Sequence, residues 1–134
     1  MLEPILRGLI GIERPILEAQ GLTMWGYAVL LSLGDEPVRT QAALAEMIGA
    51  DKTRIIGDLD ELEQRGLIGR ERDPDDRRVR LVSITSQGRR TRDRVRTAIR
   101  RHEEQLLDEF SAGDRAAFVR VARRLAKRAR AGEL

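Results

Sequence analysis

The sequence predicts a mainly α-helical fold with one small β-hairpin, which is an α+β class. Three observations lead to this prediction. Apolar residues recur with helical spacing through most of the 134 residues, and only residues 67–72 and 79–85 have the pattern of strands. The turn between these strands, residues 73–78, contains Pro74 and carries arginines at its tip. Aromatic residues are only 3 % of the chain, so we expect an aliphatic core.

Two helices are expected near the start of the chain. Apolar residues between positions 2 and 18 fall on one helical face, and Pro15 should kink this helix or restart it. Gly21 ends the segment. The next helix, residues 23–33, is almost entirely apolar, so we expect it at the centre of the fold. A turn is expected at residues 34–37, Gly-Asp-Glu-Pro.

Two short helices with clear start and stop signals precede the hairpin. Thr40 is a good N-cap for a helix through Ile48, which Gly49 ends. Asp51 caps the following helix, and Gly66 takes the position of a C-terminal glycine after it. This second helix has an apolar stripe at i, i+4 and i+7, formed by Ile55, Leu59 and Leu62.

Two longer helices are expected after the hairpin. Thr85 caps a helix to about Phe110, and Ser111 with Asp114 forms a capping box for the last helix. Their apolar stripes are Val95, Ile99, His102, Leu106 and Phe110, then Phe118, Val121, Ala122, Leu125 and Ala129. Like the first helix, they lie outside the small helix-hairpin core. Antiparallel packing of these terminal helices between two chains would bury them in a homodimer.

The positive charge is concentrated in one part of the chain. Residues 1–69 contain 6 Lys and Arg against 11 Asp and Glu, and residues 102–134 contain 7 against 6. Residues 70–101 contain 12 Arg against 5 acids, which indicates a polyanionic partner. Two short helices followed by an arginine-tipped hairpin is the order of a winged helix-turn-helix. That fold places one helix in the major groove of DNA and the hairpin, or wing, near the minor groove.

Composition argues against several other functions. The absence of cysteine and the single histidine, His102, exclude disulfides and a multi-histidine zinc site within one chain. Asp73, Asp75 and Asp76 lack the glycine and the closing glutamate of a calcium loop. There is no nucleophile–base pair and no phosphate-binding glycine loop, so we expect no catalysis, no cofactor and no metal.

The chain is also expected to be soluble and cytoplasmic. Its longest apolar run, residues 24–33, is about half the length that a membrane span needs. The amino terminus lacks the basic flank and the cleavage site of a signal peptide. We therefore expect no membrane partner.

Residues 22–90 closely resemble the MarR family of bacterial transcription regulators. The most specific piece is the wing, DPDDRR followed by LVSIT-x-x-G, which carries the family's D-x-R as Asp76-Arg77-Arg78. Two further matches are the L-A of the third helix and the R-G-L before the wing: Leu44-Ala45 and Arg65-Gly66-Leu67. The flanking helices match the family in length and order.

The resemblance implies a homodimeric winged-helix protein that binds a pseudo-palindromic operator in double-stranded DNA. Such proteins are usually repressors of adjacent genes, and a small aromatic or phenolic effector often releases them. The implied organisation is a single domain over residues 1–134. Its DNA-binding lobe would be residues 22–90, with dimerisation helices at 1–20 and 91–134. Each recognition helix would enter a major groove about one helical turn from its mate.

The same resemblance assigns DNA contacts to individual residues. Arg78 would enter the minor groove, held by Asp76, and Arg77 would lie near a phosphate. Thr40 and Gln41, which open the third helix, would touch the DNA backbone. The groove-facing side of the recognition helix would carry Lys52, Thr53, Arg54 and Ile56.

An effector site is implied less directly. In the family, the second helix lines a cleft between the dimer helices and the DNA-binding lobe. Met24, Trp25 and Tyr27 fall on that helix, and His102 lies in an apolar stripe. These four are the candidate effector contacts, and a place in the core or at the dimer interface is the alternative for each of them.

The recognition helix departs from the family pattern. The family often has a basic residue where this chain has Gly57 and an aliphatic one where it has Asp58. Residues 51–66 carry five acids against three bases: Asp51, Asp58, Asp60, Glu61 and Glu63 against Lys52, Arg54 and Arg65.

Two interpretations of this departure remain open. In the first, Asp58 pairs with Arg54 at i, i+4 or accepts a hydrogen bond from cytosine N4. In the second, the helix reads sequence poorly because its acids face phosphate, and the wing supplies most of the affinity. The second interpretation also admits an alternative function, a winged-helix protein–protein interaction module with weak or non-specific DNA binding.

Overall fold

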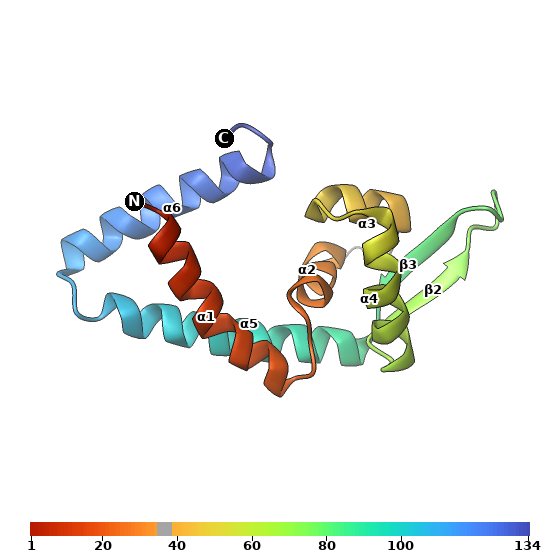
Figure 1. Ribbon diagram of the computed structural model, residues 1–134, viewed down its shortest axis with the longest axis horizontal. Helices are drawn as coiled ribbons and strands as arrows, with labels where there is room; N and C mark the ends of the chain where they lie inside the picture. Colours follow the sequence, from red (N-terminus) through yellow and green to blue (C-terminus); the bar gives the residue numbers. More distant parts are fainter. Residues whose placement is uncertain (35–38) are drawn as a thin grey trace. The chain divides into compact units, whose positions relative to one another are not determined.

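The computed structural model describes residues 1–34 and 39–134. It is mainly helical with one β-hairpin, as predicted (Figure 1). The elements in chain order are α1 (Glu3–Ala19), α2 (Met24–Leu33), β1 (Arg39–Thr40), α3 (Gln41–Ile48), α4 (Lys52–Gln64), β2 (Ile68–Arg72), β3 (Arg80–Ile84), α5 (Ser86–Leu107) and α6 (Ala112–Arg130). Of the turn expected at residues 34–37, residues 35–37 lie outside the described part of the chain.

The chain divides into two compact units, Met1–Ile99 and Arg100–Leu134. The first unit holds an aliphatic core, as the low aromatic content predicted. Helices α1 to α5, strand β3 and Ile68, the first residue of β2, all contribute to this core. Its largest fully buried side chains are Leu17, Val29, Leu30, Leu33, Leu44, Ile55, Leu59, Leu67, Val82 and Val95.

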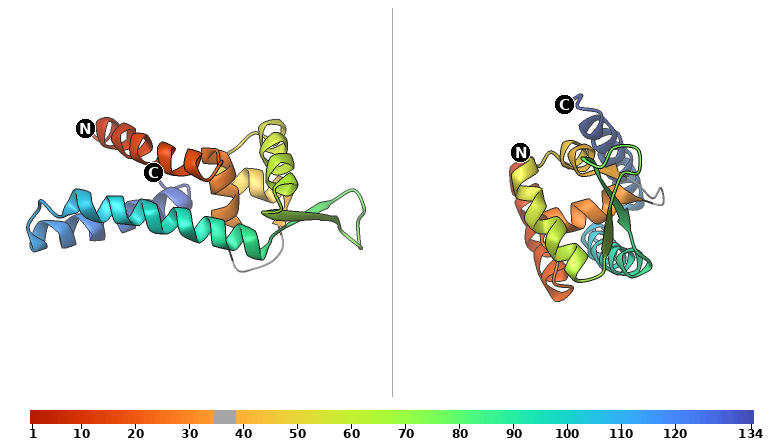
Figure 2. Two further views of the ribbon diagram at one scale, coloured as in Figure 1. Left: turned by 90° about the horizontal axis from the view of Figure 1, so that it is seen from below. Right: turned by 90° about the vertical axis from the view of Figure 1, so that its right-hand side faces the viewer.

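Helix α2 is the central helix of the first unit, as its apolar sequence predicted. It contacts α1, α3, α4 and β3 (Figure 2). Among the described residues, no single helix is long and apolar enough to cross a membrane. α1 and α2 meet those criteria only as a pair bent by 82°.

The predicted start and stop signals of α3 and α4 are confirmed. The Thr40 hydroxyl accepts a hydrogen bond from the Ala43 backbone N–H at 3.0 Å, and Gly49 ends α3 with φ of +70°. The Asp51 carboxylate accepts from the Thr53 backbone N–H at 3.1 Å and so caps α4. The buried residues of α4 are the predicted stripe of Ile55, Leu59 and Leu62.

The wing is an antiparallel hairpin in a small three-stranded sheet of order β1-β3-β2. β2 pairs with β3 from Ile68 opposite Ile84 to Arg72 opposite Arg80. The two-residue β1 pairs with the other edge of β3. Figures 1 and 2 both show the hairpin tip extending beyond α3 and α4, which leaves it accessible to a partner.

Of the two outcomes predicted for Pro15, a kink or a restart of the helix, the restart is not observed in α1. The helix neither ends nor restarts there, but continues to Ala19. Proline removes only one backbone donor, and Leu17, two residues later, is anchored in the core with 1 % of its surface exposed. Tertiary packing therefore keeps the last turn of α1 helical.

The apolar stripe predicted for α5 is divided: Val95 and Ile99 are buried in the core of the first unit, whereas Leu106 and Phe110 in the second unit are exposed, as is most of the α6 stripe. α6 has no buried residue, and the Arg115–Asp108 ion pair, 2.8 Å, joins it to the end of α5. α5 ends at Leu107, three residues before the predicted Phe110. Large apolar side chains that are 39–53 % exposed are Leu106, Phe110, Phe118, Val121 and Leu125.

The T-x-x-G that follows the wing joins the sheet to α5 through a close backbone approach. The Thr85 hydroxyl donates to the Gly66 carbonyl at 2.6 Å and accepts from the Gly88 N–H at 3.0 Å. A Cβ added at Gly88 would lie 2.0 Å from the Leu67 carbonyl oxygen and 2.8 Å from Ile84 Cγ1. Only glycine fits at position 88, because the obstacle is backbone.

We predict that Gly88→Ala destabilises the fold by about 3 kcal/mol, because relief of the clash requires β2 and α5 to separate. The measurement is urea unfolding followed by circular dichroism at one fixed protein concentration. Gly57→Ala is the matched control. A Cβ at Gly57 meets nothing within 4 Å, so alanine should raise the stability of this helix by up to about 1 kcal/mol. Equal stability of the two variants would contradict the packing argument.

Candidate nucleic-acid interface

The wing tip is a turn closed by its own hydrogen bonds. The Asp73 carboxylate accepts from the Asp75 backbone N–H at 2.8 Å. The Asp73 N–H donates to the Val79 carbonyl, and the Val79 N–H donates to the Asp76 carbonyl, both at 2.9 Å. The backbone of the tip is therefore fixed before any partner binds, which reduces the entropy cost of binding.

Asp76 holds Arg78 in a bidentate pair at the end of the wing. Asp76 Oδ1 accepts from Arg78 Nε at 3.0 Å, and Oδ2 accepts from Nη2 at 3.2 Å. The Arg78 hydrogen bond holds the pKa of Asp76 below its ordinary value, and Asp76 raises the pKa of Arg78. The Arg78 side chain is nevertheless 91 % exposed. Its orientation is thus set by Asp76, while its remaining donors face solvent.

Further arginines surround this pair. The side chains of Arg72, Arg77 and Arg80 are exposed, and Arg72 Nη1 donates to the Arg77 carbonyl at 3.4 Å. The end of β2, the tip and the start of β3 therefore present four guanidinium groups, including that of Arg78. Four acids lie on the same stretch: Glu71, Asp73, Asp75 and Asp76. Most of the positive excess predicted for residues 70–101 therefore falls on α5, where residues 86–101 contain seven Arg and one Asp.

The start of α3 lies beside the wing strand β2. The Thr40 hydroxyl oxygen is used as the helix cap. Gln41 Oε1 accepts from Arg70 Nη1 at 3.2 Å, so the side chain of the first α3 residue is tied to β2. Both Thr40 and Gln41 are half-buried rather than fully exposed.

On α4, the four side chains predicted to face the groove are all exposed. They lie away from the buried stripe, and Ile56 is 44 % exposed. The Thr53 hydroxyl donates to Asp51 Oδ1 at 2.8 Å, and this bond holds the pKa of Asp51 below its ordinary value. The structure thus brings Lys52, Thr53, Arg54 and Ile56 together on the first two turns of one helix.

The acids of α4 are mostly bonded to their own chain. Asp58 Oδ1 accepts from the Thr23 hydroxyl at 2.8 Å, and Thr23 also caps α2 by accepting from the Gly26 N–H at 2.9 Å. The Asp58 carboxylate therefore faces the start of α2. Within the described residues no ion pair joins it to Arg54, so the i, i+4 pairing considered from the sequence is not formed.

Arg70 pairs with two more of these acids and offsets one of their two negative charges. Its Nη2 donates to Asp60 Oδ1 at 2.5 Å and to Glu63 Oε1 at 2.9 Å. The hydrogen bond from Arg70 holds the pKa of Glu63 below its ordinary value, and Glu63 raises the pKa of Arg70. Sequence reasoning missed Arg70, although strand alternation could have found it. Arg70 is two residues from buried Ile68, so both side chains lie on the same face of β2.

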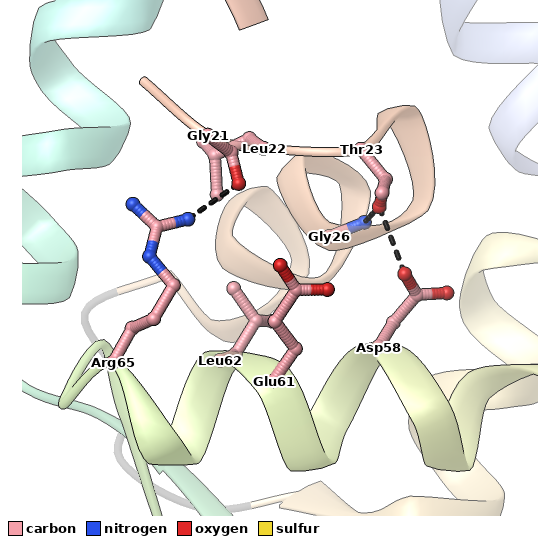
Figure 3. Close-up of a pocket in the computed structure, with 8 residues that line it drawn as sticks. All are labelled: Gly21, Leu22, Thr23, Gly26, Asp58, Glu61, Leu62 and Arg65. Atoms are coloured by element: carbon pink, nitrogen blue, oxygen red, sulfur yellow. Dashed lines mark hydrogen bonds between the residues drawn. The ribbon is translucent and has the colours of Figure 1, made fainter. Parts of the chain in front are cut away.

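A small hollow lies where α4 meets the link between α1 and α2 (Figure 3). At its edge, Arg65 Nη1 and Nη2 donate to the carbonyls of Gly21 and Gln20 at 2.5 and 2.6 Å, which caps the end of α1. The hollow has room for about one water molecule, too little for an aromatic effector. It is lined by Gly21, Leu22, Thr23, Gly26, Asp58, Glu61, Leu62 and Arg65.

The candidate effector residues lie in both units. Met24, Trp25 and Tyr27 are on the first turn of α2, where Met24 is 38 % exposed, Trp25 is half-buried and Tyr27 belongs to the core. His102 lies in the second unit and is exposed. None of the four lines the hollow beside α4. Within residues 1–34 and 39–134, no three His, Asp or Glu side chains are close enough together to hold a metal ion.

Comparison with known proteins agrees with this geometry. The model of the MarR family matches residues 22–79. The transcriptional regulator HosA of Escherichia coli O111:H- is 31 % identical over 108 residues, which are 81 % of this chain and 80 % of HosA. The crystal structure of MarR superposes with a TM-score of 0.80 at 34 % identity, over 96 % of this chain and 87 % of that one.

A third relative has been solved with two different partners. The transcriptional repressor CouR bound to a 23-mer DNA duplex superposes with a TM-score of 0.79 at 29 % identity, over 93 % of this chain and 89 % of CouR. CouR from Rhodococcus jostii RHA1 bound to p-coumaroyl-CoA superposes with a TM-score of 0.77 at 28 % identity, over 96 % of this chain and 88 % of that one. The wing, the helix pair and these likenesses together show that the chain belongs to the MarR family and is a DNA-binding transcriptional regulator.

Proposed function

We propose that the chain is a homodimeric repressor that binds a pseudo-palindromic operator and leaves it when a small aromatic or phenolic effector binds. The main support for the DNA-binding part of this proposal is the Asp76–Arg78 pair. It fixes a guanidinium that is 91 % exposed at the end of a prebuilt hairpin. An arginine presented in this way suits insertion into a minor groove, while α4 occupies the adjacent major groove.

The bonding of the α4 acids supports base reading over the alternative of a protein-interaction module. That alternative was motivated by acids that would face phosphate. Thr23 holds one of them, Asp58, and Arg70 holds Asp60 and Glu63. Arg70 offsets one of these three negative charges, and the hydrogen bonds turn the carboxylates toward the chain, so Lys52 and Arg54 at the exposed start of α4 meet less opposing charge than the sequence suggests.

The exposed apolar stripes support a homodimer. Phe118, Val121 and Leu125 on α6 are between 39 and 52 % exposed in the single chain. Contiguous apolar side chains of this size on a surface mark an interaction site. A second copy of the chain would cover them and place two recognition helices about one helical turn of DNA apart.

The repressor role and the effector are supported by CouR, a repressor that has been solved with DNA and with p-coumaroyl-CoA. Met24 and Trp25 at the start of α2 and His102 on α5 are the residues that we propose for effector contact. Tyr27 is buried in the core, so it would support the effector contacts from the inner side of α2. The effector would act by favouring a conformation in which the two wings no longer fit the operator.

We predict that Arg78→Ala weakens operator binding about 100-fold, because both wings of a dimer lose a charged contact worth about 1.5 kcal/mol or more. Lys52→Ala should weaken binding less, by about 10-fold. The measurement is a fluorescence anisotropy titration against DNA that the wild-type protein selects from a random pool.

Arg120→Ala is the control for this pair. It removes the same charge from an exposed position on α6 and should leave DNA binding unchanged. A larger effect of Lys52→Ala than of Arg78→Ala would refute the leading role of the wing. If the wild-type protein shows no preference for any sequence in the pool, the protein-interaction alternative is favoured instead.

We predict that Phe118→Asp converts a dimer into a monomer, because a carboxylate would be buried in the interface without a partner. Sedimentation velocity at micromolar concentration measures this change. Ala116→Asp introduces the same charge at another exposed position on α6 and should remain dimeric. A monomeric wild-type protein at that concentration would contradict the proposed assembly.

We predict that a phenolic acid or its coenzyme A thioester releases the operator and changes the fluorescence of Trp25, the only tryptophan. Both signals should saturate at the same concentration if the ligand binds beside α2. The test is a titration of p-coumaric acid and p-coumaroyl-CoA into the protein with and without DNA. Release of DNA with unchanged fluorescence would place the effector away from Trp25.

A further inference from the structure

We propose that Arg70 is a positioning residue for DNA binding. It orients the Gln41 side-chain amide so that the NH2 group faces a DNA phosphate, and it does not touch the DNA itself. This inference rests on the proposed function, since it concerns how the same interface is built.

Arg70 joins all three elements of the interface. It lies in the middle of β2, opposite Val82 on β3. Its Nη1 reaches Gln41 at the start of α3, and its Nη2 reaches Asp60 and Glu63 on α4. One guanidinium therefore fixes the wing strand, the start of α3 and the recognition helix relative to one another within the first unit.

Arg70 itself is poorly placed to bind a phosphate. Its side chain is only 8 % exposed, and both terminal nitrogens already donate to side chains of the same chain. The remaining donor, Nε, is buried without a hydrogen-bond partner. Any effect of Arg70 on DNA binding therefore acts through the residues that it holds.

Gln41 is the residue through which this effect reaches DNA. Its Oε1 accepts from Arg70 Nη1 at 3.2 Å, which directs its NH2 group away from β2. No described residue accepts a hydrogen bond from that NH2 group. The Gln41 amide nitrogen is not among the buried atoms that lack a partner, so its two donors are open to solvent. A phosphate oxygen beside the start of α3 would accept a hydrogen bond from them.

The same guanidinium lowers the negative charge beside the interface. The Asp60 side chain is 51 % exposed and follows Ile56 by one helical turn on α4. Without Arg70, Asp60 and Glu63 would repel phosphate, and Gln41 would lose the partner that selects its amide orientation. Both consequences weaken DNA binding in the same direction.

Gln41→Glu tests the inference most directly. Glutamate keeps an oxygen for Arg70 but replaces the outward NH2 group with a second oxygen. We expect an unchanged or higher melting temperature and operator binding that is about 100-fold weaker, because a carboxylate meets phosphate in both protomers. Gln105→Glu, the same chemical change on α5 at an exposed position, is the control and should bind like wild type. If Gln41→Glu binds the operator as tightly as wild type does, the inference is overturned.

A double-mutant cycle tests the role of Arg70 itself. Gln41→Ala and Arg70→Lys should each weaken operator binding about 10-fold relative to wild type. The double variant should bind about as tightly as each single variant, because both substitutions remove the same interaction. Lysine keeps the positive charge beside Asp60 and Glu63, so the cycle isolates the effect of Arg70 on Gln41. A double variant about 100-fold weaker than wild type would show that Arg70 acts independently of Gln41 and would overturn the inference. If Arg70→Lys does not fold, the result with Gln41→Glu decides. A wild-type protein that prefers no DNA sequence would instead refute the proposed function.

Discussion

Helix α4, which we propose as the recognition helix, can face DNA because three of its acidic side chains are bonded to other parts of the chain. Arg70 from β2 holds Asp60 and Glu63 on one flank of α4, and Thr23 from the start of α2 holds Asp58 on the other. A guanidinium as buried as that of Arg70 is stable only when it is paired, so the wing strand and α4 depend on each other. Arg70 also offsets one of the negative charges that α4 would present to a polyanion.

The wing is fixed to the rest of the molecule at a second point. Gly88 allows α5 to approach the Leu67 carbonyl, and Thr85 bonds to both Gly66 and Gly88 across this junction. The T-x-x-G that follows the wing therefore has a packing role, whereas Asp76 and Arg78 at the tip are available for binding. A rigid base and an exposed tip let the hairpin present Arg78 without ordering a loop at the moment of binding.

Sequence reasoning located the features that depend on nearby residues and missed those that depend on distant ones. The caps at Thr40 and Asp51 and the buried stripe of α4 follow from local hydrogen bonds and helical periodicity, and all were predicted. The partner of Asp58 was not, because Thr23 is 35 residues away and a nearer candidate, Arg54, was available. The continuation of α1 through Pro15 likewise depends on tertiary packing, which outweighs a local helix-breaking signal.

The bond between Thr23 and Asp58 also gives the proposed effector a short path to the recognition helix. Thr23 caps α2, and the candidate effector contacts Met24 and Trp25 are the next two residues of the same helix. A ligand that shifts the first turn of α2 would therefore disturb a hydrogen bond that holds α4. The coupling would need no long chain of intermediates, because one hydroxyl serves both helices. In this view, Asp58 on the proposed recognition helix is the residue through which that helix would respond to the ligand.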